Sequence, residues 1–379
     1  MSDMVIVGGG LAGGAAAALL ARAGSRPLLL ERESGPRDKI CGEFLSTEAQ
    51  AHLTALGLDL ARLGGARVGS VRLVASERCA EARLPFTALG LTRRRLDEAL
   101  LTHAQALGAS VERGVTVRAV SPGVVESSRG SLEARTILLA SGKHDVRGAR
   151  RDTAGAIKGM VGFKSYFRLS PSMRAALGGF VEVVLFEGGY AGLQLVEGGV
   201  ANLCLLVDHD RFDAAGRTWP GLLAELLREP HLARRLADAE ELSARPLTIA
   251  DVPYGFIHRH DDDPGLFRLG DQAAVIPSFS GDGMSIALHS ATLAARAIGE
   301  GADAGRYHAT LRADIARPVR LATWLQRRIA SWPGRRAIVF ALGLAPGGLD
   351  RLASWTRVPA SALRRAGLDP AGSDEPAAC

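Results

Sequence analysis

The chain is organised around residues 4–13, which read MVIVGGGLAG. The four leading apolar residues predict a short buried strand, and Gly8, Gly10 and Gly13 then fit the pattern Gly-x-Gly-x-x-Gly. The alanine-rich run that continues to Ala23 predicts a helix. A strand, a glycine turn and a helix in this order form the unit that binds the ADP half of a dinucleotide.

Each residue type in this unit has a physical reason. Gly8 permits the tight turn, Gly10 lets the backbone approach a pyrophosphate, and Gly13 lets the helix pack closely on the sheet. The N-terminus of the helix offers free N–H groups and the positive end of the helix dipole to phosphates. A second apolar strand ends at Glu31, whose carboxylate suits a ribose and disfavours a 2′-phosphate. The pattern therefore predicts FAD or NAD rather than NADP.

The composition is that of an ordinary globular protein. Among 379 residues 47% are hydrophobic, and the net charge is +6. Because the basic residues are not interleaved with aromatic ones, we expect no nucleic-acid partner. A basic surface would instead favour an anionic substrate or an acidic carrier protein. No run of eighteen apolar residues occurs, so no membrane span is expected.

Cysteine usage and the N-terminus predict a cytoplasmic protein. The four cysteines show no paired spacing, which fits a reducing compartment and gives no metal signature. The apolar N-terminus lacks the positive segment of a signal peptide, and its glycines are better explained by phosphate binding. The run from His258 to Gly265 contains metal-capable side chains, but its Asp-Pro-Gly sequence is typical of an exposed turn.

The rest of the chain alternates between two kinds of pattern. Helical and strand signals of the dinucleotide-binding type occupy residues 1–154, with a hairpin at about 67–90, and return at 261–300. Between them, from 155 to 260, the apolar period changes to two, which predicts a separate antiparallel sheet that serves as a substrate platform. Residues 301–370 read as helices, and 371–379 as a disordered tail. The fold class is thus α/β, a Rossmann-like domain with an inserted antiparallel β-sheet substrate domain and C-terminal helices.

Three segments carry a family resemblance through their order. They are the glycine turn with Glu31, the segment Arg93-x-x-Leu96-Asp97, and Gly270-Asp271 followed by Gly281-x-Gly283. Together they resemble the FAD-dependent oxidoreductases built like p-hydroxybenzoate hydroxylase. That superfamily includes geranylgeranyl reductases, flavin-dependent halogenases and aromatic hydroxylases. The resemblance covers residues 3 to about 330.

The resemblance implies roles for particular residues. Asp271 would hydrogen-bond the ribityl chain of FAD, and Arg93 would lie near the pyrophosphate and ribityl groups. Gly281 and Gly283 would open a helix whose N–H groups and dipole stabilise negative charge on the reduced flavin. Cys41 lies in a Cys-Gly-Glu turn like that of geranylgeranyl reductases and would pass beside the isoalloxazine. The expected cofactor-binding set is Gly8, Gly10, Ala12, Gly13, Glu31, Arg32, Cys41, Arg93, Gly142, Asp271, Gly281, Gly283 and Met284.

Some of these residues have plainer interpretations. Cys41 alone could be a small buried residue in a turn, and the run Arg93–Arg95 could be a solvated helix start. His289, on the last long helix of the nucleotide-binding pattern, reads as a packed helix residue rather than an acid or base. The sequence names no catalytic base, and Cys41 is the flavin-proximal candidate.

Two departures from the family pattern bear on the reaction. Many members have Asp-Gly after the fourth strand, where this chain has Ser141-Gly142. Reductases and halogenases carry a strand Tyr-x-Trp-x-Phe-Pro or Trp-x-Trp-x-Ile-Pro. The matching residues here are 189–195, with Gly192 at the central Trp and Leu195 at the Pro. The change argues against halogenation, puts prenyl reduction in doubt, and predicts an open cavity above the flavin that admits a bulky ring.

The sequence therefore predicts an FAD-dependent monooxygenase that hydroxylates an aromatic or polyketide-like small molecule in secondary metabolism. No second glycine motif opens a helix after a strand, so NAD(P)H is expected to dock only transiently as reductant. The alternative is a flavin-dependent reductase of carbon–carbon double bonds in an isoprenoid. A flavin-bound carrier-interaction protein without turnover is a third class, and a flavin-free NAD-dependent dehydrogenase would not explain Gly270-Asp271.

Overall fold

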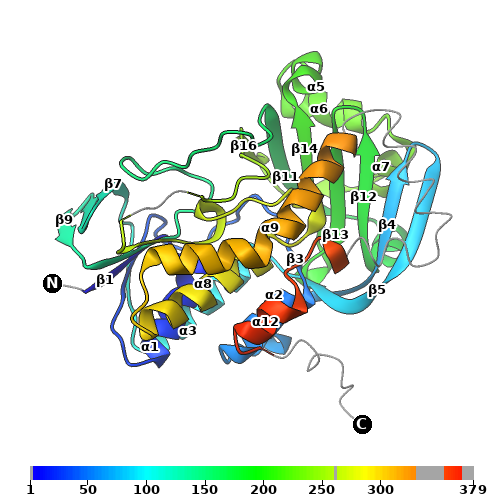
Figure 1. The fold of residues 1–379 in the computed structure, drawn as a ribbon. Helices are drawn as coiled ribbons and strands as arrows, with labels where there is room; N and C mark the ends of the chain where they lie inside the picture. Colours follow the sequence, from blue (N-terminus) through cyan, green and yellow to red (C-terminus); the bar gives the residue numbers. More distant parts are fainter. Residues whose placement is uncertain (1–2, 260–262, 330–353, 369–379) are drawn as a thin grey trace, which may run out of the picture.

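The computed structural model describes residues 3–259, 263–329 and 354–368. Within them, two large sheets stand side by side and are bridged by helices (Figure 1). Of the region predicted as helices at 301–370, residues 330–353 and 369–370 lie outside the described residues, as does the tail predicted at 371–379. So does the middle of the run from His258 to Gly265.

The first sheet is parallel and contains the segment that decides the fold. Its spatial order is β17-β10-β1-β2-β6. The strands are β1 (Met4–Val7), β2 (Leu28–Glu31), β6 (Ser110–Arg113), β10 (Thr136–Leu139) and β17 (Leu266–Arg268). Most are short apolar runs, which is what a strand covered on both faces requires. The carboxyl ends of β1, β2 and β10 lie together, and the glycine turn follows β1.

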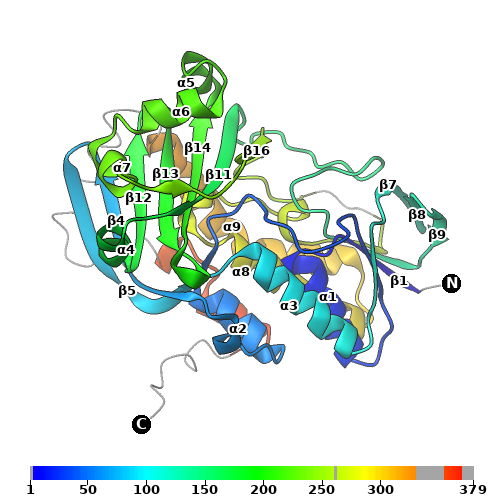
Figure 2. The ribbon, with the colours of Figure 1, turned by 180° about the vertical axis from the view of Figure 1, so that it is seen from behind.

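Helices cover one face of this sheet and a small meander covers the other. The helices α1 (Leu11–Arg22), α3 (Arg93–Ala106) and α8 (Gly283–Gly299) pack on one another and on the sheet through one apolar core (Figure 2). On the opposite face, valines of the sheet pack against the meander β7 (Val117–Ser121), β8 (Val124–Ser127) and β9 (Gly130–Glu133). The result is a three-layer nucleotide-binding architecture.

The second sheet has the spatial order β15-β11-β14-β13-β12-β4-β5-β3, with β16 also paired to β11. Its strands are β3 (Phe44–Leu45), β4 (Ala66–Ala75), β5 (Arg78–Gly90), β11 (Met160–Arg168), β12 (Gly179–Phe186), β13 (Gly189–Leu195), β14 (Ala201–Asp208), β15 (Glu240–Glu241) and β16 (Leu247–Ala250). The pairs are antiparallel except for β12 with β4. A parallel sheet, a separate sheet that is largely antiparallel, and helices toward the C-terminus confirm the predicted α/β fold class.

One hairpin lies elsewhere than the sequence suggested. The strands β4 and β5, expected at about 67–90 with the first nucleotide-binding segment, extend the second sheet because β4 pairs with β12. The physical reason is that the edge of β12 away from β13 has backbone N–H and C=O groups to pair, and β4 pairs with them in parallel, which sets Leu73 beside Val183. The platform is therefore built from two separate stretches of the chain.

Short helices cover the outer face of the second sheet. They are α4 (Pro171–Leu177), α5 (His209–Ala214), α6 (Trp219–Leu226) and α7 (Pro230–Arg235). Leucines of α6 and α7 pack on the outward side chains of the central strands, such as Leu193 and Leu203. The inner face is thereby left to turn toward the parallel half.

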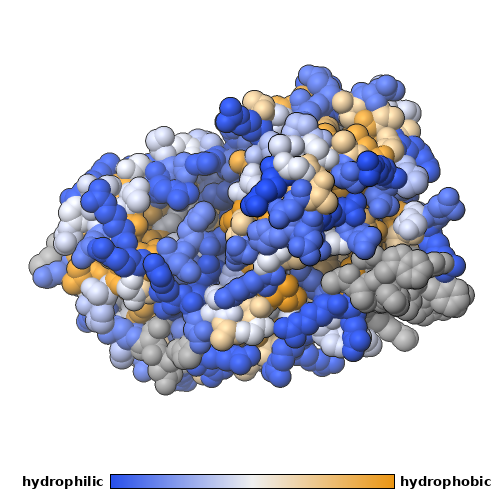
Figure 3. All heavy atoms as spheres, turned by 90° about the horizontal axis from the view of Figure 1, so that it is seen from above, coloured by the Kyte–Doolittle hydropathy of each residue, from blue (hydrophilic) through white to orange (hydrophobic). Residues whose placement is uncertain are grey.

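Further elements join the two halves. The remaining helices are α2 (Thr47–Ala55), α9 (Ala304–Ile329) and α12 (Ala360–Arg365), with short 3-10 turns η1 (Ala61–Leu63), η2 (Glu197–Gly199), η3 (Gly270–Gln272) and η4 (Ser278–Ser280). Pro318 lies inside α9, which runs beside α8 and then rises toward the second sheet (Figure 1). Polar residues cover most of the face seen from above, with apolar ones in small patches (Figure 3). Among the described residues no helix combines the length and apolar character needed to cross a bilayer.

Candidate functional site

One large cavity lies between the two sheets. Its volume is about 640 Å³, within the usual range for ligand sites. Its walls come from the carboxyl ends of the parallel strands, the Cys41–Glu43 turn, the start of α8 and the inner face of the second sheet. Twelve of the thirteen expected cofactor-binding residues line it. Gly13 lies beneath the turn instead.

The glycine turn has the backbone that its sequence predicts. Gly8 has φ +103°, and a Cβ there would lie 2.5 Å from the carbonyl oxygen of Ala140. A Cβ at Gly13 would lie 1.9 Å from the carbonyl oxygen of Gly8, so close helix packing requires glycine. Gly10 caps α1 without any side-chain hydrogen bond, which leaves N–H groups of the first turn open to a ligand. These features fit a bound pyrophosphate.

Two cations lie beside this helix N-terminus. Arg93 forms a two-pronged ion pair with Asp97 (2.8 and 2.9 Å), and Lys39 binds the same carboxylate at 2.8 Å. A Cβ at Gly10 would lie 3.3 Å from Arg93 Nη2 and 3.6 Å from Lys39 Nζ. Burial raises the pKa of Asp97, but Arg93 and Lys39 outweigh it and hold the pKa below its ordinary value. Two positive charges thus share one negative charge, and the remaining positive charge suits a phosphate. The sequence analysis singled out Arg93 and missed Lys39.

Glu31 is oriented toward the glycine turn. Its Oε2 accepts the N–H of Gly9 at 2.5 Å, and its Oε1 accepts the N–H of Glu33 at 2.9 Å. Arg32 is more than half exposed and pairs with Glu33. Both Glu31, the expected ribose contact, and Arg32 line the cavity.

Asp271 also lines the cavity and binds a lysine. Lys143 donates to its Oδ2 at 2.9 Å, and Arg151 donates to its backbone carbonyl at 3.0 Å. Burial raises the pKa of Asp271, but the charge of Lys143 outweighs burial and holds the pKa below its ordinary value. The carboxylate is therefore ionised at neutral pH. Gln272 donates to the carbonyl of Gly142 (2.7 Å), which ties the Ser141-Gly142-Lys143 turn to η3. The side chain of Lys143 was not anticipated as a site residue.

The turn before α8 presents a second open helix start. Gly281 has φ +71°, and a Cβ there would lie 2.9 Å from the ring of Phe44. A Cβ at Gly283 would meet nothing within 4 Å, so open space faces this residue. Asp282 makes no capping bond to α8 and accepts the N–H of Val358 instead. Free N–H groups at this end can stabilise negative charge in the cavity. Met284 lines the same wall.

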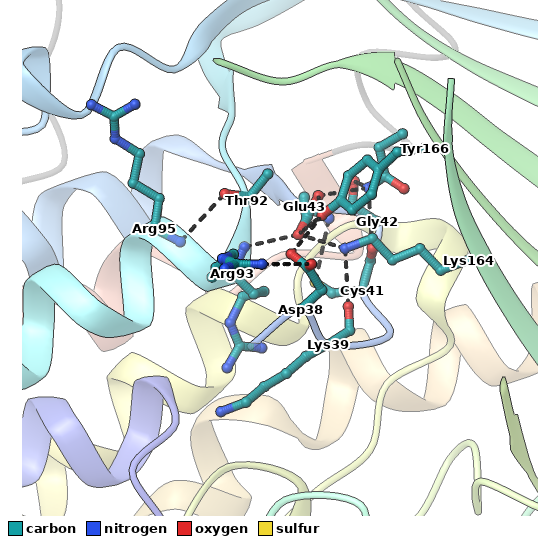
Figure 4. Close-up of polar contacts among 12 residues, drawn as sticks. Asp38, Lys39, Cys41, Gly42, Glu43, Thr92, Arg93, Arg95, Lys164 and Tyr166 are labelled. Atoms are coloured by element: carbon teal, nitrogen blue, oxygen red, sulfur yellow. Dashed lines mark hydrogen bonds and ion pairs between the residues drawn. The ribbon is translucent and has the colours of Figure 1, made fainter. Parts of the chain in front are cut away.

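The Cys41-Gly42-Glu43 turn is fastened to the second sheet through a buried polar cluster (Figure 4). Glu43 has φ +60° and is fully buried. Its Oε1 accepts Lys164 Nζ at 2.5 Å and the backbone N–H of Arg93 at 2.8 Å. Tyr166 also donates to the carboxylate (2.9 Å). The Sγ of Cys41 accepts the N–H of Glu43 at 3.3 Å and borders the cavity.

Asn202 completes the attachment of this turn. Its Nδ2 donates to the carbonyls of Cys41 (3.2 Å) and Gly42 (3.1 Å) and to Glu43 Oε2 (3.0 Å). Sequence reasoning missed Lys164, Tyr166 and Asn202. A signal existed for the first two, because they sit two residues apart in one strand and so share one face.

The inner face of the second sheet forms an apolar floor with a gap. Gly192 lies between Val183 on β12 and Cys204 on β14. A Cβ at Gly192 would make only ordinary contact, 3.5 Å from the carbonyl oxygen of Cys204. Glycine is therefore not required by packing, and its missing side chain leaves space over the floor. Burial raises the pKa of the Cys204 thiol to about 12, so it stays protonated.

The acidic residues of the neighbouring strands are engaged elsewhere. Glu182 is fully buried on the opposite face of β12, where it binds Arg72, His231 and Arg235. Glu197, beside a glycine turn, accepts both the N–H and the hydroxyl of Thr92. His289 is buried and pairs with Asp314 at 2.9 Å, away from the cavity lining, in agreement with a packed helix residue.

Comparisons with known proteins agree with this geometry. Residues 1–128 match the family model described as "FAD binding domain". A flavin-dependent halogenase of Armillaria mellea is 24% identical over 341 residues, covering 78% of this chain and 67% of that protein. A menaquinone reductase of Mycolicibacterium smegmatis is 26% identical over 318 residues, covering 79% and 77%.

Solved structures share the fold. A flavoprotein/dehydrogenase from Cytophaga hutchinsonii superposes with a TM-score of 0.75 at 19% identity, covering 93% of this chain and 92% of that one. The halogenase PltM, solved with phloroglucinol and FAD, gives a TM-score of 0.70 at 15% identity, covering 87% and 77%. Identities this low establish a common architecture and leave the reaction to the chemistry of the cavity.

Proposed function

We propose that this chain catalyses the monooxygenation of an aromatic or polyketide-like small molecule. It belongs to the FAD-dependent oxidoreductase superfamily that includes p-hydroxybenzoate hydroxylase, the geranylgeranyl reductases and the flavin-dependent halogenases. The observation that carries the proposal is one cavity that joins the glycine turn to an apolar floor with open space at Gly192. NAD(P)H is the proposed transient reductant.

The residues present fit FAD. We propose that the Gly8–Gly13 turn, Arg93 and Lys39 hold the pyrophosphate, that Glu31 holds the ribose and that Asp271 holds the ribityl chain. FAD bound there would supply two-electron transfer and oxygen activation. The start of α8 would stabilise negative charge on the reduced flavin. Val183, Gly192 and Cys204 would hold the substrate ring against the flavin and keep water away.

The state of the carboxylates favours oxygen chemistry over alkene reduction. Reduction of a carbon–carbon double bond requires an acid that protonates a carbon, whereas hydroxylation needs a dry, oxygen-accessible flavin face. Among the described residues, each carboxylate that lines the cavity is already bound by a cation or by hydrogen-bond donors. They are Glu31, Glu33, Asp38, Glu43, Asp145 and Asp271. None is a free proton donor aimed at the floor.

Reduction of an isoprenoid double bond is the second candidate. The observation that favours it is the length of the apolar floor, which continues past Gly192 along β12 and β4 through Val183 and Leu73 to Leu84 on β5. A chain-like substrate would fit such a strip. The menaquinone reductase among the similar proteins also favours it. An acidic carrier protein is a further proposed partner, because the net charge is +6.

Isotope labelling decides between the two reactions. The FAD-loaded protein is reduced without air and mixed with ¹⁸O₂ in the presence of candidate phenols or quinones, and products are analysed by mass spectrometry. We expect one ¹⁸O atom in the product, with the second leaving as water. Clean saturation of an alkene without oxygen would overturn the proposal in favour of the reductase. The variant Gly192→Trp, which restores the missing aromatic, should keep FAD and abolish labelling.

A further inference from the structure

The inner face of β13 carries two buried polar side chains on either side of Gly192. Tyr190, Gly192 and Gln194 all line the cavity, because alternate residues of a strand share one face. Tyr190 is 7% exposed and Gln194 is 2% exposed. Within the described residues, the Nε2 and Oε1 of Gln194 have no hydrogen-bond partner. The Tyr190 hydroxyl makes no hydrogen bond of standard geometry, although Ser278 and the backbone of Phe279 lie beside it. Buried polar atoms are nearly always paired, so these are available to a ligand.

Neighbouring polar groups are already committed. Asn202 lies directly opposite Gln194, but its Nδ2 holds the Cys41–Glu43 turn. Its Oδ1 also lacks a partner among the described residues, yet Asn202 does not line the cavity. Beside Tyr190, Ser278 donates its hydroxyl to Tyr254 at 2.8 Å. Among the described residues of this floor, Gln194 therefore faces the cavity with its amide unpaired, and the Tyr190 hydroxyl, beside Ser278, can turn its proton toward a ligand.

The space between them suits a flat ring. Four residues of extended strand place Tyr190 and Gln194 about 13 Å apart at the backbone. Gly192 lies midway, flanked by Val183 and the protonated thiol of Cys204. A ring system lying over Gly192 would direct its two edges toward the two polar side chains.

We propose that Gln194 and Tyr190 are the specificity-determining residues of this cavity. Gln194 pairs with an adjacent donor and acceptor on one edge of a flat ring substrate, as a lactam or carboxamide offers, and Tyr190 donates to an oxygen at the opposite edge. A primary amide presents one donor and one acceptor side by side, so it recognises an edge that presents both. Burial raises the pKa of Tyr190 well above its ordinary value, which keeps the hydroxyl a donor. The inference deepens the proposed function and rests on it.

A matched pair of probes tests the Gln194 contact. 2-Quinolone has adjacent N–H and C=O groups, and 1-methyl-2-quinolone has the same ring with the donor blocked. Each is titrated into oxidised, FAD-loaded protein while the flavin absorbance is followed. We expect the wild type to bind 2-quinolone ~10-fold more tightly than 1-methyl-2-quinolone, and we expect Gln194→Leu to bind the two probes equally. The control is Gln326→Leu, which removes a buried glutamine on α9 that does not line the cavity.

A second probe isolates Tyr190. 6-Hydroxy-2-quinolone adds an oxygen at the opposite edge, and we expect the wild type to bind it roughly 5-fold more tightly than 2-quinolone. Tyr190→Phe should lose this preference while still binding 2-quinolone more tightly than 1-methyl-2-quinolone. A wild type that binds neither quinolone, or binds both equally, overturns the inference, as does unchanged discrimination in Gln194→Leu. Labelling by ¹⁸O₂ is measured separately. If ¹⁸O is incorporated but the protein does not discriminate between the probes, this inference alone is refuted. If the probes are discriminated but no ¹⁸O is incorporated, hydroxylation alone is refuted.

Discussion

The glycine turn at Gly8–Gly13 and the floor at Gly192 both depend on glycine, for opposite reasons. In the turn, added Cβ atoms would lie 2.5 Å and 1.9 Å from backbone oxygens at Gly8 and Gly13. On the floor, a Cβ at Gly192 would lie 3.5 Å from its nearest neighbour. The backbone requires the first glycines, whereas the floor glycine only leaves space. A turn of this kind can be interpreted locally, while the floor acquires meaning only from the strands beside it.

The largest expected effect separates these two kinds of glycine. Gly13→Ala should destabilise the protein by about 4 kcal/mol or more and abolish FAD binding, because a backbone clash at a tight helix–turn contact has no flexible side chain to relieve it. Gly192→Ala should change the free energy of unfolding by less than about 0.5 kcal/mol. Urea unfolding and bound-FAD content measure both. Equal losses of stability and of bound FAD in the two variants would contradict the distinction between the two kinds of glycine.

The next effect concerns the cluster that fastens the Cys41–Glu43 turn to the floor. Lys164→Met should destabilise the protein by about 3–5 kcal/mol, because it leaves the carboxylate of Glu43 buried without its cation. The double variant Lys164→Met with Glu43→Gln should recover much of the loss, since no buried charge is then left. Thermal unfolding measures the series. A double variant as unstable as Lys164→Met would show that lost packing, and not charge, is responsible.

A smaller effect is expected on the nucleotide side of the cavity. Asp271→Ala should weaken FAD binding by about 1.5–3 kcal/mol, the value of a hydrogen bond to a charged group. Equilibrium titration of apoprotein with FAD measures it. Asp213→Ala, which removes an exposed carboxylate paired with Arg217, is the matched control and should bind FAD normally. An unchanged affinity in Asp271→Ala would mean that the ribityl contact is misplaced.

The turn before α8 should give the protein a pH dependence. Burial, with Glu48 nearby, raises the pKa of Asp282 to about 7. The folded state then holds a proton that the unfolded state releases near pH 4, so this stabilisation is present at low pH and is lost as pH rises through 7. Relative to Asp282→Asn, the wild type should lose up to about 1.4 kcal/mol of unfolding free energy per pH unit between pH 5 and 7. Urea unfolding at pH 5, 6, 7 and 8 measures both proteins, and parallel curves would refute the assignment.

The smallest effect is expected where the two regions meet. Cys41→Ser should keep the yellow colour and the stability of the protein, because the Cys41 side chain is only partly buried at the edge of the core and accepts one weak hydrogen bond, from the N–H of Glu43. FAD content and the visible spectrum measure this outcome. Turnover that also stays intact would make Cys41 a turn residue only, whereas a colourless Cys41→Ser protein would show that the thiol supports the cofactor.

The difference between the regions also explains what could be predicted. The glycine turn, the helix after it and the strand ending at Glu31 depend on contacts within about thirty residues, and the sequence placed them correctly. The hairpin at 67–90 was recognised, but its place in the second sheet was not. Its pairing with β12 joins residues more than 100 positions apart, and no local pattern specifies that register.

By itself, the sequence determined the nucleotide-binding turn, the alternation that makes the second sheet, and the glycine at the centre of its floor. These follow from backbone sterics and from the period of apolar residues, which are local properties of the chain. Only the tertiary structure decided that Lys39 joins Arg93 at Asp97, that Lys164 reaches Glu43 across 121 residues, and that Gln194 faces the cavity without a hydrogen-bond partner among the described residues. Such partnerships exist only after distant strands pair, because burial and the choice of neighbour are set by the assembled sheets and not by any segment within them.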